Sequence, residues 1–155
     1  MKFSHIVIVF ITFFASAGMA VSQTSSGTQE YGDGGAYEGE FLNGLPHGNG
    51  TYELPNGYRY VGEWFEGEIN GQGEALFPNG SVYIGSFVKG KPEGSGKITF
   101  TDGGTYEGEW ANGSITGEGY AKYANGTTYQ GTFLDAMHDG KGCLLYTSDA
   151  ADEHG

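Results

Sequence analysis

The stretch YEGEFLNGLPHGNGTYELPNGYR, residues 37–59, decides the fold, because its pattern recurs along the chain with a period of 23 residues. The tyrosine that opens it returns without an insertion or deletion and marks five copies: Tyr37, Tyr60, Tyr83, Tyr106 and Tyr129. A fixed period of this length is typical of a tandem array in which each unit buries its apolar side chains against the next.

Glycine and aromatic residues occupy fixed places in every copy. With the tyrosine as position 1, glycine stands at positions 3, 12 and 14 and an aromatic residue at position 5. We predict that the residues which define the repeat are structural: Tyr37, Gly39, Phe41, Tyr60, Gly62, Trp64, Tyr83, Gly85, Phe87, Tyr106, Gly108, Trp110, Tyr129, Gly131 and Phe133. The pattern predicts no catalytic, cofactor-binding or metal-binding residue.

The array is predicted to span residues 27–142. A half repeat at 27–36 precedes full repeats at 37–59, 60–82, 83–105 and 106–128, and a truncated copy follows at 129–142. Residues 21–26 are rich in Ser, Gln and Thr and are predicted to form a short linker.

Each repeat is predicted to contribute two β-strands. Apolar and acidic residues alternate from Tyr37 to Phe41, which indicates a half-buried strand, and a second strand is expected over positions 14 to 18. Pro55 before Asn56-Gly57 favours a three-residue loop, a type I turn followed by a left-handed glycine, over a two-residue turn. This loop places position 16 opposite position 1 and glycine 14 opposite glycine 3. The fold class is therefore an all-β, single-sheet, solenoid-like ribbon of β-hairpin repeats.

The glycines at positions 3 and 14 are expected to have a packing role. Glycine in a strand costs about 0.5–1 kcal/mol relative to alanine, so the geometry must require it. We expect these positions to form slots across which the neighbouring aromatic rings lie. Stability would then come from stacking between successive repeats.

The pattern Tyr-x-Gly-x-Trp/Phe-x-x-Gly-x-x-x-Gly-x-Gly resembles the MORN repeat, the membrane occupation and recognition nexus motif. The resemblance covers Gly27 to Gly142. It implies a ribbon of hairpins that serves as a spacer, a partner-binding surface or a membrane contact.

The N-terminal residues 1–20 are predicted to be a cleaved signal peptide. Lys2 precedes an apolar run from Ile6 to Ala15, and small residues follow at a suitable cleavage distance. A secreted or periplasmic location is expected. The alternative is an uncleaved signal that anchors the chain in a membrane.

The C-terminal residues 143–155 break the composition of the array and carry Cys143, the sole cysteine of the chain. The run from Cys143 to Glu153 resembles the translation of a sequencing adapter. We therefore interpret these residues as a non-native tail, with Gly142 the last residue of the natural sequence before it. The alternative is a genuine end to the fifth hairpin, with Leu144 and Tyr146 at positions 16 and 18.

The charge of the chain excludes some classes of partner. The net charge is −12, and the acidic excess persists between residues 21 and 142. Such a surface repels nucleic acid and anionic lipid headgroups. We predict no nucleic-acid partner, and membrane contact is disfavoured.

Enzymatic function is not expected. His47 and His138 are the two histidines between residues 21 and 142, and they stand at unlike positions of distant repeats. Glu38 and Glu40 share a strand face, but a solvated outer face accounts for them. Exposed aromatic candidates for ligand contact are few, chiefly Tyr58, Phe65 and Tyr120.

The sequence therefore predicts an exported, non-enzymatic scaffold or protein-interaction module without a cofactor. Its partner is expected to be an unidentified protein or a second copy of the chain. Two alternatives stay open: a membrane-associated module that binds lipid headgroups, and the regulatory repeats of an enzyme whose catalytic domain follows Gly142.

Overall fold

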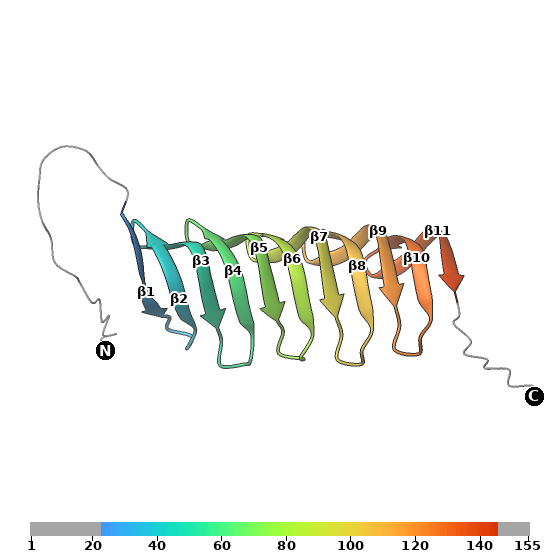
Figure 1. Ribbon diagram of the computed structural model, residues 1–155, viewed down its shortest axis with the longest axis horizontal. Coiled ribbons are helices and arrows are strands. Elements are labelled where there is room, and N and C mark those ends of the chain that lie inside the picture. The colour runs from blue at the N-terminus through green and yellow to red at the C-terminus, as the bar shows by residue number, and fades with distance from the viewer. Residues whose placement is uncertain (1–22, 146–155) are drawn as a thin grey trace, which may run out of the picture.

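The computed structural model describes residues 23–145, which form a single antiparallel sheet in which every strand pairs with its neighbours in sequence (Figure 1). The strands are β1 (Thr24–Glu30), β2 (Ala36–Leu42), β3 (Leu45–Glu53), β4 (Arg59–Phe65), β5 (Glu68–Leu76), β6 (Val82–Val88), β7 (Lys91–Thr99), β8 (Thr105–Ala111), β9 (Ser114–Lys122), β10 (Thr128–Leu134) and β11 (Met137–Leu145). The predicted all-β ribbon of hairpins is confirmed. We number the repeats 1 to 5 from the tyrosines at positions 37, 60, 83, 106 and 129.

The turn between repeats has the predicted form. The amide of Gly57 donates to the carbonyl of Leu54 at 3.0 Å, and Gly57 has a φ of 91°. The Asn56 side-chain oxygen accepts the amide of Tyr58 at 2.9 Å, which stiffens the turn. The predicted register is confirmed, since Tyr52 pairs with Tyr60 and Gly50 pairs with Gly62.

The second strand of each repeat is longer than predicted, which corrects the expectation that it covers positions 14 to 18. In repeat 1 it runs from Leu45 to Glu53, positions 9 to 17. It begins early because Asn43 and Gly44 form a two-residue turn with φ values of 53° and 81°. Positive φ at both central residues is the geometry of a type I′ hairpin turn. Each repeat therefore contains one turn of this type, and a longer turn joins it to the next repeat.

A bulge interrupts the pairing within each repeat. In repeat 1 the register shifts between Gly39 and Phe41, and Gly48 at position 12 has a φ of 69°. The Glu40 carboxylate accepts the amide of Asn49 at 2.8 Å, and the equivalent bond recurs from Gln72 to Glu63 and from Glu118 to Glu109. These position 4 glutamates therefore cap the bulge, a role beyond that of a solvated outer face.

The rings at positions 1 and 5 form a continuous column along the sheet. Tyr37 lies edge-on to Phe41 of its own repeat at 5.1 Å and to Trp64 of the next repeat at 4.8 Å. The contact to the next repeat recurs between Tyr60 and Phe87 at 5.0 Å, and in repeats 3 and 4 as Tyr83 with Trp110 and Tyr106 with Phe133. The predicted stacking between repeats is confirmed, and edge-to-face geometry is the favoured arrangement of such rings.

The two ends of the array differ from their predicted limits. Strand β1 begins at Thr24, which corrects the linker expected at 21–26, because residues 24–26 pair with the free edge of β2. Strand β11 includes Cys143, Leu144 and Leu145, so these three residues complete the fifth hairpin in the structure. The predicted signal peptide at 1–20 and residues 146–155 lie outside the described residues, and the foreign origin of the tail stays a prediction.

Candidate functional site

The inner face of the ribbon carries the buried side chains. We define it as positions 1, 3, 5, 14 and 16 together with position 10, which lies opposite position 5 across the hairpin. The five repeat tyrosines are 0% to 5% exposed. Each tyrosine hydroxyl donates to the backbone carbonyl three residues on, at 2.8 Å to Glu40 in repeat 1 and 3.2 Å to Thr132 in repeat 5.

The predicted glycine slots are present in the structure, and the tyrosine rings fill them. A Cβ added to Gly39 would lie 2.5 Å from the Tyr37 hydroxyl and 2.5 Å from the Cα of Gly50. A Cβ added to Gly50 would collide with the Tyr37 ring itself. The same collisions recur in repeats 2 to 5. The ring therefore covers both glycines, and the sequence-based account of these columns is confirmed.

Burial shapes the acid–base properties of the ring column. Burial raises the pKa of Tyr37 to about 12, and it raises the pKa of Tyr83 to about 12. Burial also raises the pKa values of Tyr60 and Tyr106. Neutral phenols in an apolar slab are structural groups and are poor candidates for general acids or bases at neutral pH.

Two further positions fill the inner face beside the ring column. One is position 16. The other is the residue two before each repeat tyrosine, at the end of the turn between repeats, and we call it the exit residue. In repeat 1 the exit residue is Gly35, and a Cβ there would lie 2.5 Å from the hydroxyl of Tyr52 at position 16. The two positions therefore share one space, so that a large side chain at one requires a small residue at the other.

This compensation holds in the first three repeats. The pairs are Gly35 with Tyr52, Tyr58 with Ala75, and Ser81 with Ile98. Tyr58 is partly buried against the core, with its ring 6.0 Å from Phe77, and Ala75 is 0% exposed. This corrects the expectation that Tyr58 is an exposed aromatic residue.

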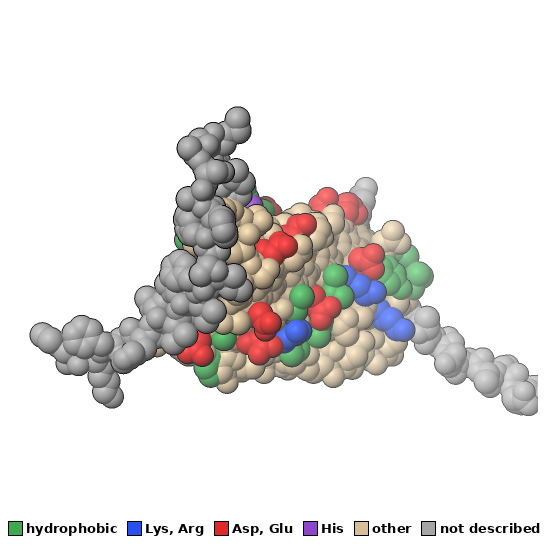
Figure 2. Space-filling model, turned by 60° about the vertical axis from the view of Figure 1, so that its left-hand side comes forward, with side chains coloured by type: hydrophobic (Ala, Val, Ile, Leu, Met, Phe, Trp, Pro, Cys, Tyr) green, Lys and Arg blue, Asp and Glu red, His purple; other side chains and the backbone are tan. Residues whose placement is uncertain are grey.

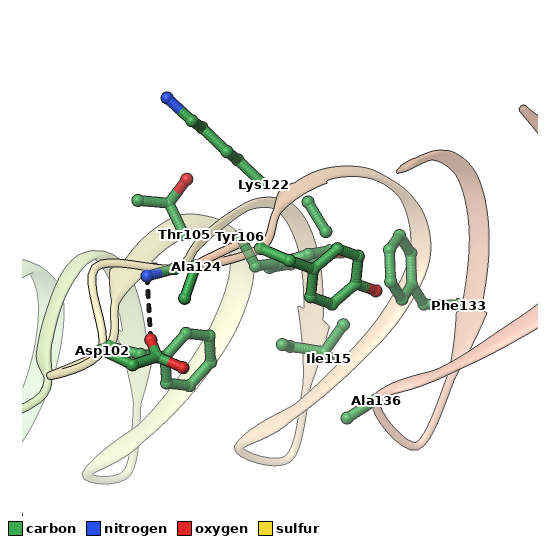
Figure 3. Close-up of a pocket in the computed structure, with 12 residues that line it drawn as sticks. Asp102, Thr105, Tyr106, Ile115, Lys122, Ala124, Phe133 and Ala136 are labelled. Carbon is green, nitrogen blue, oxygen red and sulfur yellow. Dashed lines mark hydrogen bonds between the residues drawn. The ribbon is translucent and has the colours of Figure 1, made fainter. Parts of the chain in front are cut away.

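Repeat 4 lacks the compensation and has a hollow in its inner face. Both members of its pair are small, Gly104 and Ala121, and a space of about 160 Å³ opens beside them. Its apolar walls are Phe100, Tyr106, Ile115, Tyr123, Phe133 and Ala136. Figure 3 shows Tyr106, Ile115 and Phe133 converging on this space from the adjacent strands β8, β9 and β10.

The rim of the hollow carries two charged residues. One oxygen of the Asp102 carboxylate accepts the amide of Gly104 at 2.8 Å, the dashed contact in Figure 3. Lys122 extends its amino group away from the other labelled residues in the same view. The hollow is therefore apolar inside, with an acidic group at one edge.

The outer face is charged and largely solvated. On the face seen in Figure 2, acidic side chains alternate with basic and hydrophobic ones. Arg59 pairs with Glu53 at 2.8 Å and Lys97 pairs with Glu107 at 3.6 Å, all four side chains being well exposed. Such pairs contribute about 0–1 kcal/mol each, so this face adds little to stability.

Among the remaining predicted candidates, His47 and Phe65 lie together with ring centres 5.3 Å apart, whereas Tyr120 and His138 belong to other repeats. Phe65 and Tyr120 are 51% and 44% exposed and lie in different repeats. His47 accepts the amide of Glu66 at 3.4 Å. His138 stacks on Tyr129 with ring centres 3.7 Å apart, at the end of the ring column. The hollow was not predicted from the sequence, in which its one signal is the coincidence of two small residues at Gly104 and Ala121.

The described residues contain no cluster of three or more metal-ligating side chains placed to hold an ion. Between residues 23 and 145, no helix has the length and apolar character needed to cross a membrane.

The family model described as MORN repeat matches the chain five times, at residues 37–57, 60–82, 83–105, 106–128 and 129–150. Together these matches cover well over half of the chain, including the hollow of repeat 4. A search of curated proteins finds no match. MORN repeats indicate a protein-interaction or membrane-binding module, and such repeats are generally non-catalytic.

Proposed function

Because the chain belongs to the MORN repeat family, we propose that it is an exported, non-enzymatic scaffold that binds a partner protein through its inner face. The observation that carries this proposal is the hollow of repeat 4. Native inner faces are packed to high density, so a place where both filling residues are small calls for an external occupant.

The walls of the hollow favour one apolar side chain of the partner. A volume of about 160 Å³ suits a branched aliphatic or aromatic group, and the walls offer ring faces and a methyl group. An anchor side chain in a pocket of this kind supplies most of the binding energy of many small interfaces. The Asp102 carboxylate at the rim and the net charge of −12 favour a partner segment with a basic residue beside the anchor.

The charge distribution favours a protein over a membrane as the partner. Arg59 and Lys97 are already paired with glutamates. An anionic headgroup would therefore meet a surface of net negative potential. We expect no nucleic-acid partner for the same reason.

Export and the absence of catalysis are part of the proposal. The signal-like residues 1–20 support a secreted or periplasmic location, or a membrane anchor if the signal is not cleaved. Expression in a secreting host followed by N-terminal sequencing tests the location. A mature chain that begins near residue 21 is expected, and a cytosolic chain that keeps Met1 would contradict export. The buried polar groups of the inner face serve the fold, which supports a role without chemistry.

The test of partner binding compares the native chain with Ala121→Ile, which fills the hollow, and with Ile84→Thr on the outer face as a matched control. The purified chains are immobilised and exposed to the extracellular or periplasmic fraction of the source cells. A partner retained by the native chain and by Ile84→Thr, and lost with Ala121→Ile, is the expected result. Equal retention by all three chains would contradict a role for the hollow.

Liposome flotation separates the membrane alternative. The chain is mixed with vesicles of zwitterionic lipid or with vesicles that contain anionic lipid, with and without calcium. We expect the chain to stay at the bottom of the gradient in every mixture. Flotation that requires anionic lipid would favour the membrane-binding function instead.

A further inference from the structure

Asparagine followed by glycine is unusually frequent in this array. Seven such pairs occur: Asn43-Gly44, Asn49-Gly50, Asn56-Gly57, Asn70-Gly71, Asn79-Gly80, Asn112-Gly113 and Asn125-Gly126. Turn chemistry explains their presence, since these residues tolerate positive φ. The same pair is also the dipeptide most prone to spontaneous deamidation, because glycine does not hinder its own amide nitrogen.

The reaction needs a free backbone amide. The nitrogen of the glycine attacks the side-chain carbonyl carbon of the asparagine, a new carbon–nitrogen bond closes a succinimide, and the side-chain nitrogen leaves as ammonia. Water then opens the ring at either carbonyl and yields aspartate or isoaspartate. A glycine amide that is held in a hydrogen bond must first break that bond, which slows the step.

Two of the seven pairs form a matched comparison. Asn43-Gly44 and Asn112-Gly113 both occupy exposed type I′ turns, with φ values of 53° and 81° in the first and 50° and 85° in the second. Their dipeptide, turn type and exposure class are therefore the same.

The two turns differ in how they are tied to the preceding repeat. Gly113 donates its amide to the carbonyl of Pro92 at 2.9 Å, and Asn112 donates its amide to the Glu93 carboxylate at 2.7 Å. The equivalent tie recurs from Gly67 to Pro46 and from Gly90 to Ile69. The turn at Asn43 follows the half repeat, and neither of its two amides makes such a bond within residues 23–145.

In the other five Asn-Gly pairs, the glycine amide is hydrogen-bonded within its turn or the glycine lies in a paired strand. The amides of Gly57, Gly80 and Gly126 donate to the carbonyls of Leu54, Phe77 and Tyr123 inside their turns. Gly50 in β3 is paired with Gly39 and Gly62, and Gly71 at the bulge of β5 is paired with Phe87 of β6.

We propose that Asn43 is a selective site of spontaneous deamidation in the folded protein. The ties between repeats protect the equivalent turn at Asn112, whereas within residues 23–145 the half repeat that precedes Asn43 supplies none. Isoaspartate inserts an extra carbon into the backbone, so the two-residue turn can no longer close with its native geometry. The expected consequence is a frayed β2–β3 hairpin next to the N-terminal edge of the ribbon, with repeats 2 to 5 intact.

The test follows both asparagines in one sample. The native chain is incubated in mildly alkaline buffer, digested at intervals, and analysed by mass spectrometry with separation of aspartate from isoaspartate peptides. We expect deamidation at Asn43 to exceed that at Asn112 by about tenfold, the ratio given by one retained hydrogen bond. The same chain in concentrated urea provides the reference, in which the two rates should converge.

The proposal fails if Asn43 and Asn112 react at equal rates in the folded chain, or if Asn112 is faster. A rate ratio in the folded chain that merely equals the ratio in urea would also overturn it, because the difference would then come from local sequence. Since both sites lie in one molecule, a change in global stability cannot mimic the expected result.

Discussion

Repeats 2 and 4 carry the same residues on the ring face and differ in whether that face is full. Both have tyrosine at position 1, tryptophan at position 5, isoleucine at position 10 and alanine at position 16. Both alanines are buried, Ala75 at 0% and Ala121 at 5% exposed, but Ala121 of repeat 4 borders a hollow of about 160 Å³.

The difference comes from the exit residue, which is not among the residues that the two repeats have in common. Tyr58 leaves the turn before repeat 2 and packs on the core, while Gly104 stands at the same place before repeat 4. The repeat motif therefore fixes the ribbon, and the variable exit residue decides where the ribbon is open to a partner.

The largest effect is expected from alkaline pH, which ionises the buried tyrosines of both repeats at once. Burial raises the pKa values of Tyr60 and Tyr106, and those of Tyr37 and Tyr83 to about 12. Exposed phenols in the unfolded chain lose their protons near pH 10. The contribution of these tyrosines to stability is therefore constant below about pH 10 and falls between about pH 10 and 12 as the unfolded state releases protons that the folded state retains.

Urea titrations monitored by circular dichroism at a series of alkaline pH values check this expectation. The midpoint should fall steadily above about pH 10 and recover when the pH is lowered. A midpoint that is unchanged up to about pH 12 would mean that the tyrosines are not buried as described.

The second prediction concerns alanine substitutions that close the glycine slot in repeat 2 or in repeat 4. A Cβ at Gly73 would lie 2.5 Å from the Tyr60 hydroxyl, and one at Gly119 would lie 2.5 Å from the Tyr106 hydroxyl. Gly73→Ala and Gly119→Ala should each cost about 3 kcal/mol in the free energy of unfolding, because the ring must leave its slot. Gly32→Ala, with no atom within 4 Å of the added Cβ, serves as the control and should change stability by less than about 0.5 kcal/mol. A cost confined to one of the two repeats would break the claim that their ring faces are equivalent.

The third prediction is that one substitution, alanine to isoleucine at position 16, changes the free energy of unfolding in opposite directions in repeats 2 and 4. Ala75→Ile adds volume at a position that is already 0% exposed and should destabilise the chain by about 1–3 kcal/mol. Ala121→Ile fills the hollow and should stabilise it by about 0.5–2 kcal/mol. Chemical denaturation of both variants measures the two changes, and the same sign in both repeats would remove the distinction between them.

The smallest effect concerns the two tryptophans. Trp110 donates its indole nitrogen to the carbonyl of Gly96 at 3.2 Å, whereas the buried indole nitrogen of Trp64 has no partner within the described residues. Trp110→Phe should therefore cost about 1 kcal/mol more than Trp64→Phe. Phenylalanine already stands at this position in repeats 1, 3 and 5, so both variants should fold. Equal costs by thermal unfolding would show that the Trp110 bond adds nothing to stability.

The main features of the fold could be predicted because they follow from local rules. The Asn-Gly pair after Pro55 identified the turn, and the turn fixed the register that pairs Tyr52 with Tyr60. The glycine columns gave the ring packing because no other residue leaves such a slot.

The second turn was missed because its sequence signal is weak. Glu66 and Lys89 occupy the first turn position of repeats 2 and 3 with a φ of 49°, a conformation that neither residue favours. The bulge caps were missed as well, since the bond from the Asn49 amide to Glu40 joins residues nine apart and depends on the bulge geometry.

The hollow could not be predicted from the repeat motif. It depends on two variable residues, Gly104 and Ala121, whose proximity becomes known only when the exit residue is placed on the inner face. The collision between a Cβ at Gly35 and Tyr52 is the structural observation that links the two positions.

The most direct measurement places a small apolar probe in the ribbon and observes the methyl signals of Ala75 and Ala121 by NMR. Xenon enters apolar spaces of this kind without chemical modification of the protein. The predicted result is a shift of the Ala121 methyl signal with increasing xenon pressure and an unchanged Ala75 signal. Equal shifts of both signals, or none at either, would contradict the claim that the inner face is open beside Ala121 and filled beside Ala75.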